Sequence, residues 1–97
     1  MEYRELGRTG LNVSRFCFGS LTIGPLQAGL PLKQGADLIR LAVAEYGINF
    51  IDTAELYRTY PYIGQALEGI GRDVTVAAKS YASTGQEMEA SLGLALK

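Results

Sequence analysis

The segment Gly47–Tyr57, with the sequence GINFIDTAELY, decides the fold of this chain. A short apolar run begins after a glycine, ends at the carboxylate Asp52, and is followed five positions later by Tyr57. The run is too short and too apolar for a solvent-exposed helix, so we interpret it as a buried strand. Asp52 then lies where the strand becomes a loop, which in parallel α/β proteins is the edge that carries functional groups.

A second strand of the same kind, Val74–Ala78, follows and ends at Lys79. If the two strands are parallel, Asp52 and Lys79 lie on one rim of the sheet. There they can pair, because an isolated charge at a buried edge carries a large desolvation penalty. Side chains alternate along a strand, so both residues are predicted to point to the inner face. Tyr57 lies in the loop between the strands, and the three side chains are predicted to converge.

The rest of the chain alternates between predicted strands and helices. Runs at 3–6 and 11–13 flank a glycine-containing turn and predict a hairpin. Predicted strands at 15–18, 49–52 and 74–78 precede helices that begin near residues 31, 59 and 84. This order requires parallel strands with right-handed crossovers. Two packing predictions follow. Cys17, between two phenylalanines, is predicted to be buried. The apolar stripe of the first helix is predicted to contain Leu38, Leu41, Ala42 and Glu45, broadened by Ile39, Val43 and Tyr46.

Composition excludes several classes of protein. The 97 residues are 47% hydrophobic and 20% charged, which is ordinary for a globular domain. A net charge of −1 gives no electrostatic reason to expect nucleic acid or an anionic membrane as a partner. There is no apolar stretch of about 18 residues and no signal-peptide pattern at the start. The single Cys17 excludes an internal disulfide and fits a reducing compartment, so we predict a cytoplasmic protein without a metal site.

Three segments, Tyr3–Ser14, Gly47–Tyr57 and Ala77–Lys79, together resemble the aldo-keto reductase family. The resemblance implies reduction of a small-molecule carbonyl by NADPH on a TIM (β/α)8 barrel, with Asp52, Tyr57 and Lys79 as catalytic residues. It also implies that the loop after the first barrel strand, with Gly19, Ser20 and Leu21, binds the cofactor together with Asp52.

The resemblance also implies that the chain is the N-terminal part of a single α/β barrel domain. Residues 1–14 would be the bottom hairpin and residues 15–97 three βα units, whereas a complete barrel needs roughly 250 residues. The family's catalytic His follows a fourth strand, and this sequence contains no histidine. No helix stop signal precedes Lys97, so we expect a truncated barrel that is inactive alone. The loop Arg58–Gly64 resembles reductases that carry an added iron-sulfur segment downstream.

The three residues suit carbonyl reduction, which needs a hydride at carbon and a proton at oxygen. A tyrosine is a weak acid at neutral pH, but a nearby ammonium favours its phenolate. Tyr57 would be the general acid, Lys79 its electrostatic tuner, and Asp52 the group that orients Lys79. Two alternatives stay open: a non-catalytic NADPH-binding sensor or regulatory subunit on the same barrel, and a barrel aldolase with Lys79 as Schiff-base amine. Each residue also has a purely structural interpretation. Asp52 could be an N-cap or turn former, Tyr57 a packing residue and Lys79 a solvated charge.

Overall fold

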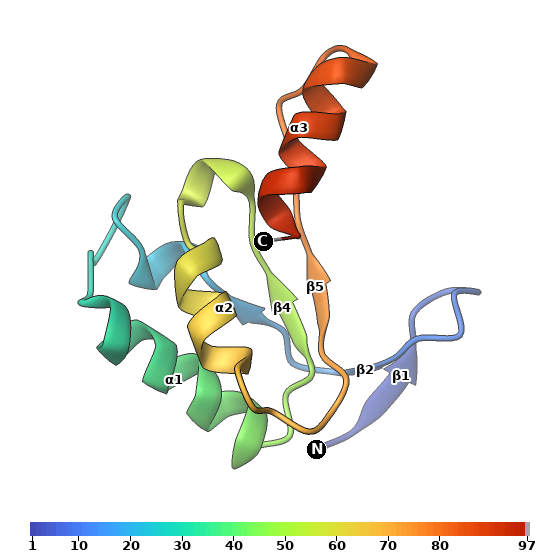
Figure 1. The fold of residues 1–97 in the computed structure, drawn as a ribbon. Coiled ribbons are helices and arrows are strands. Elements are labelled where there is room, and N and C mark those ends of the chain that lie inside the picture. Colours follow the sequence, from blue (N-terminus) through green and yellow to red (C-terminus); the bar gives the residue numbers. More distant parts are fainter. Residues whose placement is uncertain (97) are drawn as a thin grey trace.

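The computed structural model describes residues 1–96 and shows a mixed α/β fold with two small sheets (Figure 1). The antiparallel pair is β1 (Tyr3–Glu5) with β2 (Asn12–Ser14). The parallel sheet contains β3 (Phe18–Gly19), β4 (Phe50–Asp52) and β5 (Thr75–Ala77), in that order. Each parallel strand precedes one of the helices α1 (Leu32–Ala44), α2 (Tyr60–Leu67) and α3 (Gly85–Ala95). The predicted hairpin and parallel strands are confirmed, and the three strands form no closed barrel.

The hairpin lies at the start of β4, at the opposite end of that strand from Asp52. The side chain of Asn49, just before β4, accepts a hydrogen bond from the Ser14 amide (2.6 Å) and donates one to the Asn12 carbonyl (2.8 Å). The Tyr3 hydroxyl donates to the carbonyl of Gly47 (2.7 Å). Gly47 has a φ of +73°, which a glycine adopts without strain, and this lets the chain leave α1 and enter β4.

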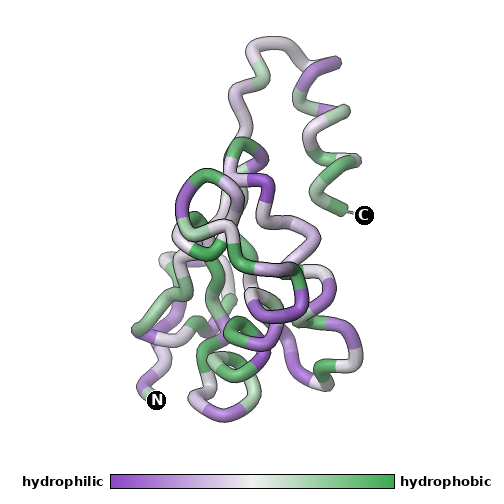
Figure 2. Tube along the Cα trace, turned by 90° about the vertical axis from the view of Figure 1, so that its left-hand side faces the viewer, coloured by the Kyte–Doolittle hydropathy of each residue, from purple (hydrophilic) through white to green (hydrophobic). Residues whose placement is uncertain are grey.

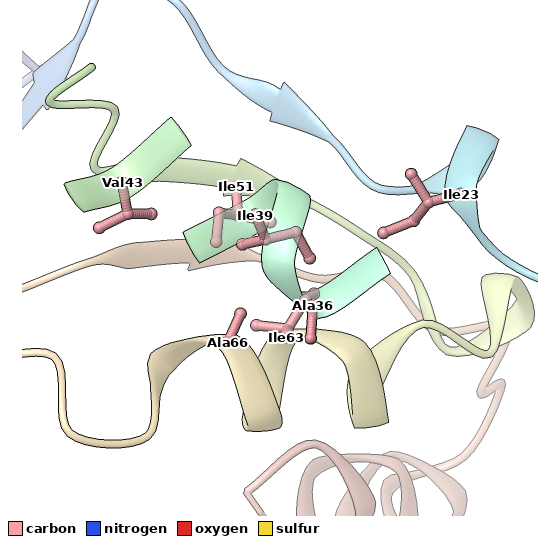
Figure 3. Close-up of a cluster of buried hydrophobic side chains, with 7 residues drawn as sticks. All are labelled: Ile23, Ala36, Ile39, Val43, Ile51, Ile63 and Ala66. Carbon is pink, nitrogen blue, oxygen red and sulfur yellow. The ribbon is translucent and has the colours of Figure 1, made fainter. Parts of the chain in front are cut away.

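The hydrophobic core lies between the parallel sheet and the layer formed by α1 and α2 (Figure 3). Ile51 of β4 is fully buried beneath both helices. The other members of the core are Ile23, Ala36, Ile39, Val43, Ile63 and Ala66. Because Ile51 faces the helices, its neighbours Phe50 and Asp52 face the opposite side of the sheet, as the alternation of side chains predicts.

The predicted apolar stripe of α1 is partly wrong. Leu38 and Leu41 are 42% and 46% exposed, and Tyr46 beyond the helix is 65% exposed. The buried face contains Ile39 and Val43, as predicted, together with Gly35 and Ala36. Its small residues let α2 approach closely, and the ring of Tyr62 lies directly against Gly35.

The prediction for Cys17 is also wrong, because its side chain is exposed. The first parallel strand is shorter than expected and covers Phe18 and Gly19 only. Phe18 packs against the core, so alternation turns Cys17 to the uncovered inner face of the sheet. Partial desolvation, followed by the negative charge of Asp52, raises the pKa of the Cys17 thiol, and the influence of Asp52 agrees with a position on the inner face. Phe16 is 70% exposed.

Helix α3 stands apart from the α1–α2 layer, on an extended segment after β5 (Figures 1 and 2). It starts at the predicted cap: the Thr84 hydroxyl accepts from the Glu87 amide (3.1 Å), and the Glu87 carboxylate accepts from the Ser83 amide (2.8 Å). The helix ends at Ala95 and buries none of its residues, so Val76 on β5 stays 39% exposed. The predicted continuation to Lys97 lies outside the described residues. Within residues 1–96, no helix has both the length and the apolar character needed to cross a membrane.

Candidate active site

Asp52 and Lys79 meet at the carboxyl-terminal edge of the parallel sheet. Asp52 ends β4 and is paired in register with Ala77 of β5, two residues before Lys79. The Lys79 ammonium donates to Asp52 Oδ1 (2.8 Å) and to the carbonyl oxygen of Thr53 (2.7 Å). Both side chains lie on the inner face, as the strand alternation predicts. The ammonium is therefore held between a carboxylate and a backbone carbonyl.

Tyr57 completes the group from the loop after β4. It is the last residue of the short 3-10 helix η2 (Glu55–Tyr57), which lies within the predicted loop between the two strands. The Lys79 ammonium lies over the Tyr57 ring, 5.2 Å from its centroid, which is within the range of a cation–π contact. The backbone brings the two segments together as well, because the Glu55 amide donates to the Lys79 carbonyl (3.0 Å). The predicted convergence of Asp52, Tyr57 and Lys79 is thus present in the structure.

The ion pair is more open to solvent than the sequence suggested. The side chains of Lys79 and Asp52 are 52% and 42% exposed, so the expected large desolvation penalty is absent in this chain. The hydrogen bond to Asp52 is the main cause that raises the pKa of Lys79 above its ordinary value of 10.5. Desolvation opposes this increase, while the negative charge of Asp52 and the neighbouring Tyr57 side chain add to it. Lys79 is consequently an ammonium at neutral pH.

A small pocket of about 150 Å³ adjoins the site and is lined by Ala54, Leu56, Tyr57, Lys79, Ser80 and Tyr81. A larger apolar groove of about 910 Å³ lies on the other side of the sheet, between α2, β5 and α3. The groove contains none of the three converging residues, so its size does not make it the better candidate for chemistry. The geometry of the charged groups places the candidate site at the small pocket.

The predicted cofactor-binding residues after β3 differ in what they offer a ligand. Gly19 is in register with Asp52, and a Cβ built on it would meet nothing within 4 Å, so the inner face is open there. Ser20 is fully buried, and its hydroxyl is hydrogen-bonded to that of Thr59 (2.8 Å). Leu21 is half-buried at the start of the 3-10 helix η1 (Leu21–Ile23). The role of these residues toward a cofactor stays a prediction.

Two residues that the sequence reasoning did not single out lie directly behind the site. Thr53 and Thr59 are both fully buried, and their hydroxyls are 2.8 Å apart. Thr53 follows Asp52, and Thr59 comes two residues after Tyr57. Thr53 lies inside the segment Gly47–Tyr57 and Thr59 lies two residues beyond it, and this closeness is the one signal in the sequence that could have drawn attention to them.

Residues 15–93 match the sequence profile of the Aldo/keto reductase family. The chain belongs to this family. The match includes Asp52, Tyr57 and Lys79. It contains the segments Gly47–Tyr57 and Ala77–Lys79 on which the resemblance rests, whereas Tyr3–Ser14 precedes the matched residues.

The chain is also similar to individual proteins and to solved structures. A rice (Oryza sativa subsp. japonica) protein named as a probable voltage-gated potassium channel subunit beta is 36% identical over 88 residues, covering 84% of this chain and 26% of that protein. A solved structure titled as a putative aldo-keto reductase from Pseudomonas aeruginosa superposes with a TM-score of 0.81 at 29% identity, covering 97% of this chain and 39% of that one. The holo form of aldo-keto reductase AKR11C1 from Bacillus halodurans gives a TM-score of 0.68 at 32% identity, covering 89% and 28%. This chain thus spans well under half the length of each.

Proposed function

We propose that this chain supplies Asp52, Tyr57 and Lys79 to an oxidoreductase that reduces aldehydes or ketones to alcohols with NADPH. The observation that carries the proposal is the position of the Lys79 ammonium, 2.8 Å from Asp52 and 5.2 Å from the centre of the Tyr57 ring. A cation held this close to the phenol can stabilise negative charge that develops there during the reaction. In this proposal Tyr57 gives its phenolic proton to the carbonyl oxygen, which acquires negative charge as the hydride reaches the carbon. Lys79 stabilises the phenolate that Tyr57 becomes, and Asp52 orients Lys79.

The residues near the site fit the approach of a flat nicotinamide ring. Gly19 leaves the inner face open at the level of Asp52, so a ring can lie against the backbone there. Leu21 offers an apolar contact beside it. The Ser20 hydroxyl is already hydrogen-bonded to Thr59, so we propose that Ser20 contributes through its backbone. NADPH would supply the hydride when bound. The sequence holds no GxGxxG motif, so the fingerprint of a Rossmann dinucleotide site is absent from it.

The decisive experiment is the variant Tyr57→Phe in the natural gene product that carries this chain. NADPH oxidation would be followed with a panel of aliphatic and aromatic aldehydes, and NADPH affinity by fluorescence titration. We expect kcat to fall by about 10²- to 10⁴-fold, the usual contribution of a general acid, with NADPH affinity unchanged. Tyr46→Phe is the matched control, because Tyr46 is 65% exposed and comes before the start of β4, whereas Asp52 lies at the other end of that strand. Equal turnover in Tyr57→Phe and the unmodified protein would refute the role of Tyr57.

A second candidate function, a non-catalytic NADPH-binding regulatory subunit, is favoured by the name of the rice relative. The discriminating result would be saturable NADPH binding without oxidation across the whole aldehyde panel. A Schiff-base aldolase is disfavoured, because such a lysine must lose its proton to react. Here the hydrogen bond to Asp52 raises the pKa of Lys79 and keeps it charged. A cytoplasmic setting and a downstream iron-sulfur segment stay predictions.

A further inference from the structure

Three buried hydroxyl groups meet directly behind the candidate site. The Thr59 hydroxyl lies 2.8 Å from that of Ser20 and 2.8 Å from that of Thr53. All three side chains are fully buried, with a relative exposure of 0%. They come from three different places: Ser20 from the loop after β3, Thr53 from the end of β4, and Thr59 from the residue before α2. We call them the hydroxyl cluster.

The hydroxyl cluster closes the loop that carries Tyr57. The hydrogen bond between Thr53 and Thr59 joins the two ends of this loop, six residues apart, and Tyr57 lies between them. The loop makes a tight turn at Arg58, which has a left-handed backbone with φ 58° and ψ 35°. The bond from Thr59 to Ser20 then attaches the closed loop to the segment after β3. The orientation of Tyr57 is therefore fixed from both ends of its loop.

The same cluster is connected to Lys79 through the backbone of Thr53. The Thr53 carbonyl accepts the 2.7 Å hydrogen bond from the Lys79 ammonium, and the Thr53 amide donates to the Ala77 carbonyl (2.8 Å). Thr53 is thus held by its amide, its carbonyl and its hydroxyl. A shift of the Thr53 side chain would move the carbonyl that anchors the ammonium, so the cluster bears on both Tyr57 and Lys79.

Helix capping does not explain the cluster. Thr59 is the N-cap residue of α2, where a threonine hydroxyl ordinarily accepts a hydrogen bond from the first turn. In this chain the Thr59 side chain makes no such cap bond. Its single hydroxyl hydrogen can be donated to only one neighbour, so it must accept from the other. The Thr59 hydroxyl therefore makes its hydrogen bonds with the buried hydroxyls of Ser20 and Thr53 and makes none with the first turn of α2.

We propose that the hydroxyl cluster is a positioning device that holds the Tyr57 loop and the Thr53 carbonyl so that phenol and ammonium stay aligned. The proposal rests on the proposed reductase function for its kinetic consequence. It assigns Ser20, Thr53 and Thr59 as positioning residues that act through Tyr57 and Lys79. In this proposal the Ser20 side chain supports the Tyr57 loop through its hydrogen bond to Thr59, and it does not reach the open inner face of the sheet.

The kinetic test compares Thr59→Val with Thr59→Ser in the natural gene product. Valine keeps the shape and removes the hydroxyl, whereas serine keeps the hydroxyl and removes the methyl group. We expect Thr59→Val to lower kcat by about 10- to 100-fold, because a misplacement of about 1 Å can reduce turnover about 100-fold. The KM for NADPH should be unchanged, and Thr59→Ser should restore kcat. Ile63→Val in the core of α2 is the control, because it lowers stability without touching the hydroxyls.

A second measurement does not require catalysis. Brief acetylation with acetic anhydride, followed by peptide mass spectrometry, reports how firmly the Lys79 amine is held. In Thr59→Val we expect Lys79 to react up to about tenfold faster, the effect of losing one hydrogen bond. Lys33, 81% exposed and paired with Asp37 on α1, is the internal reference and should not change. If Thr59→Val does not fold, Ser20→Ala removes one arm of the cluster and is measured in the same way.

The outcomes separate this proposal from the proposed function. Lys79 labelling that is the same in the unmodified protein, Thr59→Val and Ser20→Ala would overturn the positioning role, whatever the enzyme activity. A fall in kcat that Ile63→Val reproduces at equal loss of stability would overturn it too. Absence of aldehyde reduction in the unmodified protein would refute the reductase function alone, and faster Lys79 labelling in Thr59→Val would still support the positioning role.

Discussion

The contact between α1 and α2 predicts that one substitution, glycine to alanine, has opposite effects at two helical positions. A Cβ added at Gly35 in α1 would lie 2.6 Å from Cε1 of Tyr62 and closer still to Cδ1, in a fully packed region. The same Cβ at Gly64 in α2 would meet nothing within 4 Å. Both glycines lie inside helices, so the intrinsic helical gain from alanine is the same at both.

The magnitudes follow from the two environments. Alanine in place of glycine inside a helix ordinarily stabilises by about 0.5 to 1 kcal/mol, which is the result expected for Gly64→Ala. At Gly35 the ring of Tyr62 must move, and overpacking of this kind destabilises by about 1 to 3 kcal/mol. The moved ring would also weaken the hydrogen bond that the Tyr62 hydroxyl donates to the Leu30 carbonyl (2.6 Å), a contribution of about 1 kcal/mol. Gly35→Ala should therefore lower the free energy of unfolding by roughly 1 to 3 kcal/mol.

The assay is urea unfolding of the natural gene product, followed by far-ultraviolet circular dichroism. Gly93→Ala in α3, another open helical position, serves as a second control and should stabilise like Gly64→Ala. Combining Gly35→Ala with Tyr62→Leu should cost less than the sum of the two single changes, because the shorter side chain removes the clash. A Gly35→Ala protein as stable as Gly64→Ala would refute the close packing of α1 on α2.

Three further predictions concern single residues. Arg58→Gly should raise the free energy of unfolding by up to about 1 kcal/mol, because a left-handed backbone (φ 58°) strains a non-glycine residue; a lower urea midpoint would contradict this. The hydrogen bonds from Ser83 lower the pKa of Glu87 below its ordinary value of 4.5. The ionised carboxylate therefore stabilises α3 above pH 4.5, and this stabilisation is lost as the pH falls through the lower pKa of the folded state. Amide hydrogen exchange in α3 should accelerate over that pH range, and Glu87→Gln should abolish this pH dependence. Lys79→Met should lower kcat by about 10² to 10³ at neutral pH, and undiminished turnover would exclude its electrostatic role. The Asp52 contact raises the pKa of Lys79 above 10.5, so the ion pair persists below that pH and is lost only as the pH rises through the folded pKa.

The convergence of the charged residues could be predicted because parallel register and strand alternation leave little freedom. Asp52 is opposite Ala77, and Lys79 lies two residues further, or about 6.6 Å along the strand direction. Both side chains face the inner side, and a lysine side chain is long enough to reach back across that distance. Once the two segments are recognised as neighbouring parallel strands, the contact between Asp52 and Lys79 can be predicted without knowing how the helices pack.

The buried face of α1 could not be predicted in the same way. Leu38 and Leu41 have a helical spacing that fits a buried stripe as well as Ile39 and Val43 do. The structure buries the second pair because Gly35 leaves room for the Tyr62 ring of α2 on that side. Periodicity identifies that a helix has an apolar face, but the size of the residues that meet the neighbouring helix decides which face it is.

The hydroxyl cluster shows where local reasoning gives the wrong answer for a single side chain. Local rules assign the hydroxyl of Thr59 to the first turn of α2, as an N-cap. Its actual partners are Thr53, six residues earlier, and Ser20, 39 residues earlier. Burial explains why the Thr59 hydroxyl bonds to these partners and not to the amides of α2. The amides at the start of a helix can form hydrogen bonds with water, whereas the hydroxyls of Ser20 and Thr53 are fully buried and need a partner within the protein. The tertiary fold thus decides which partner a polar side chain takes when a buried partner lies beside it. The residues that hold Tyr57 become recognisable only once its loop and the segment after β3 are brought together.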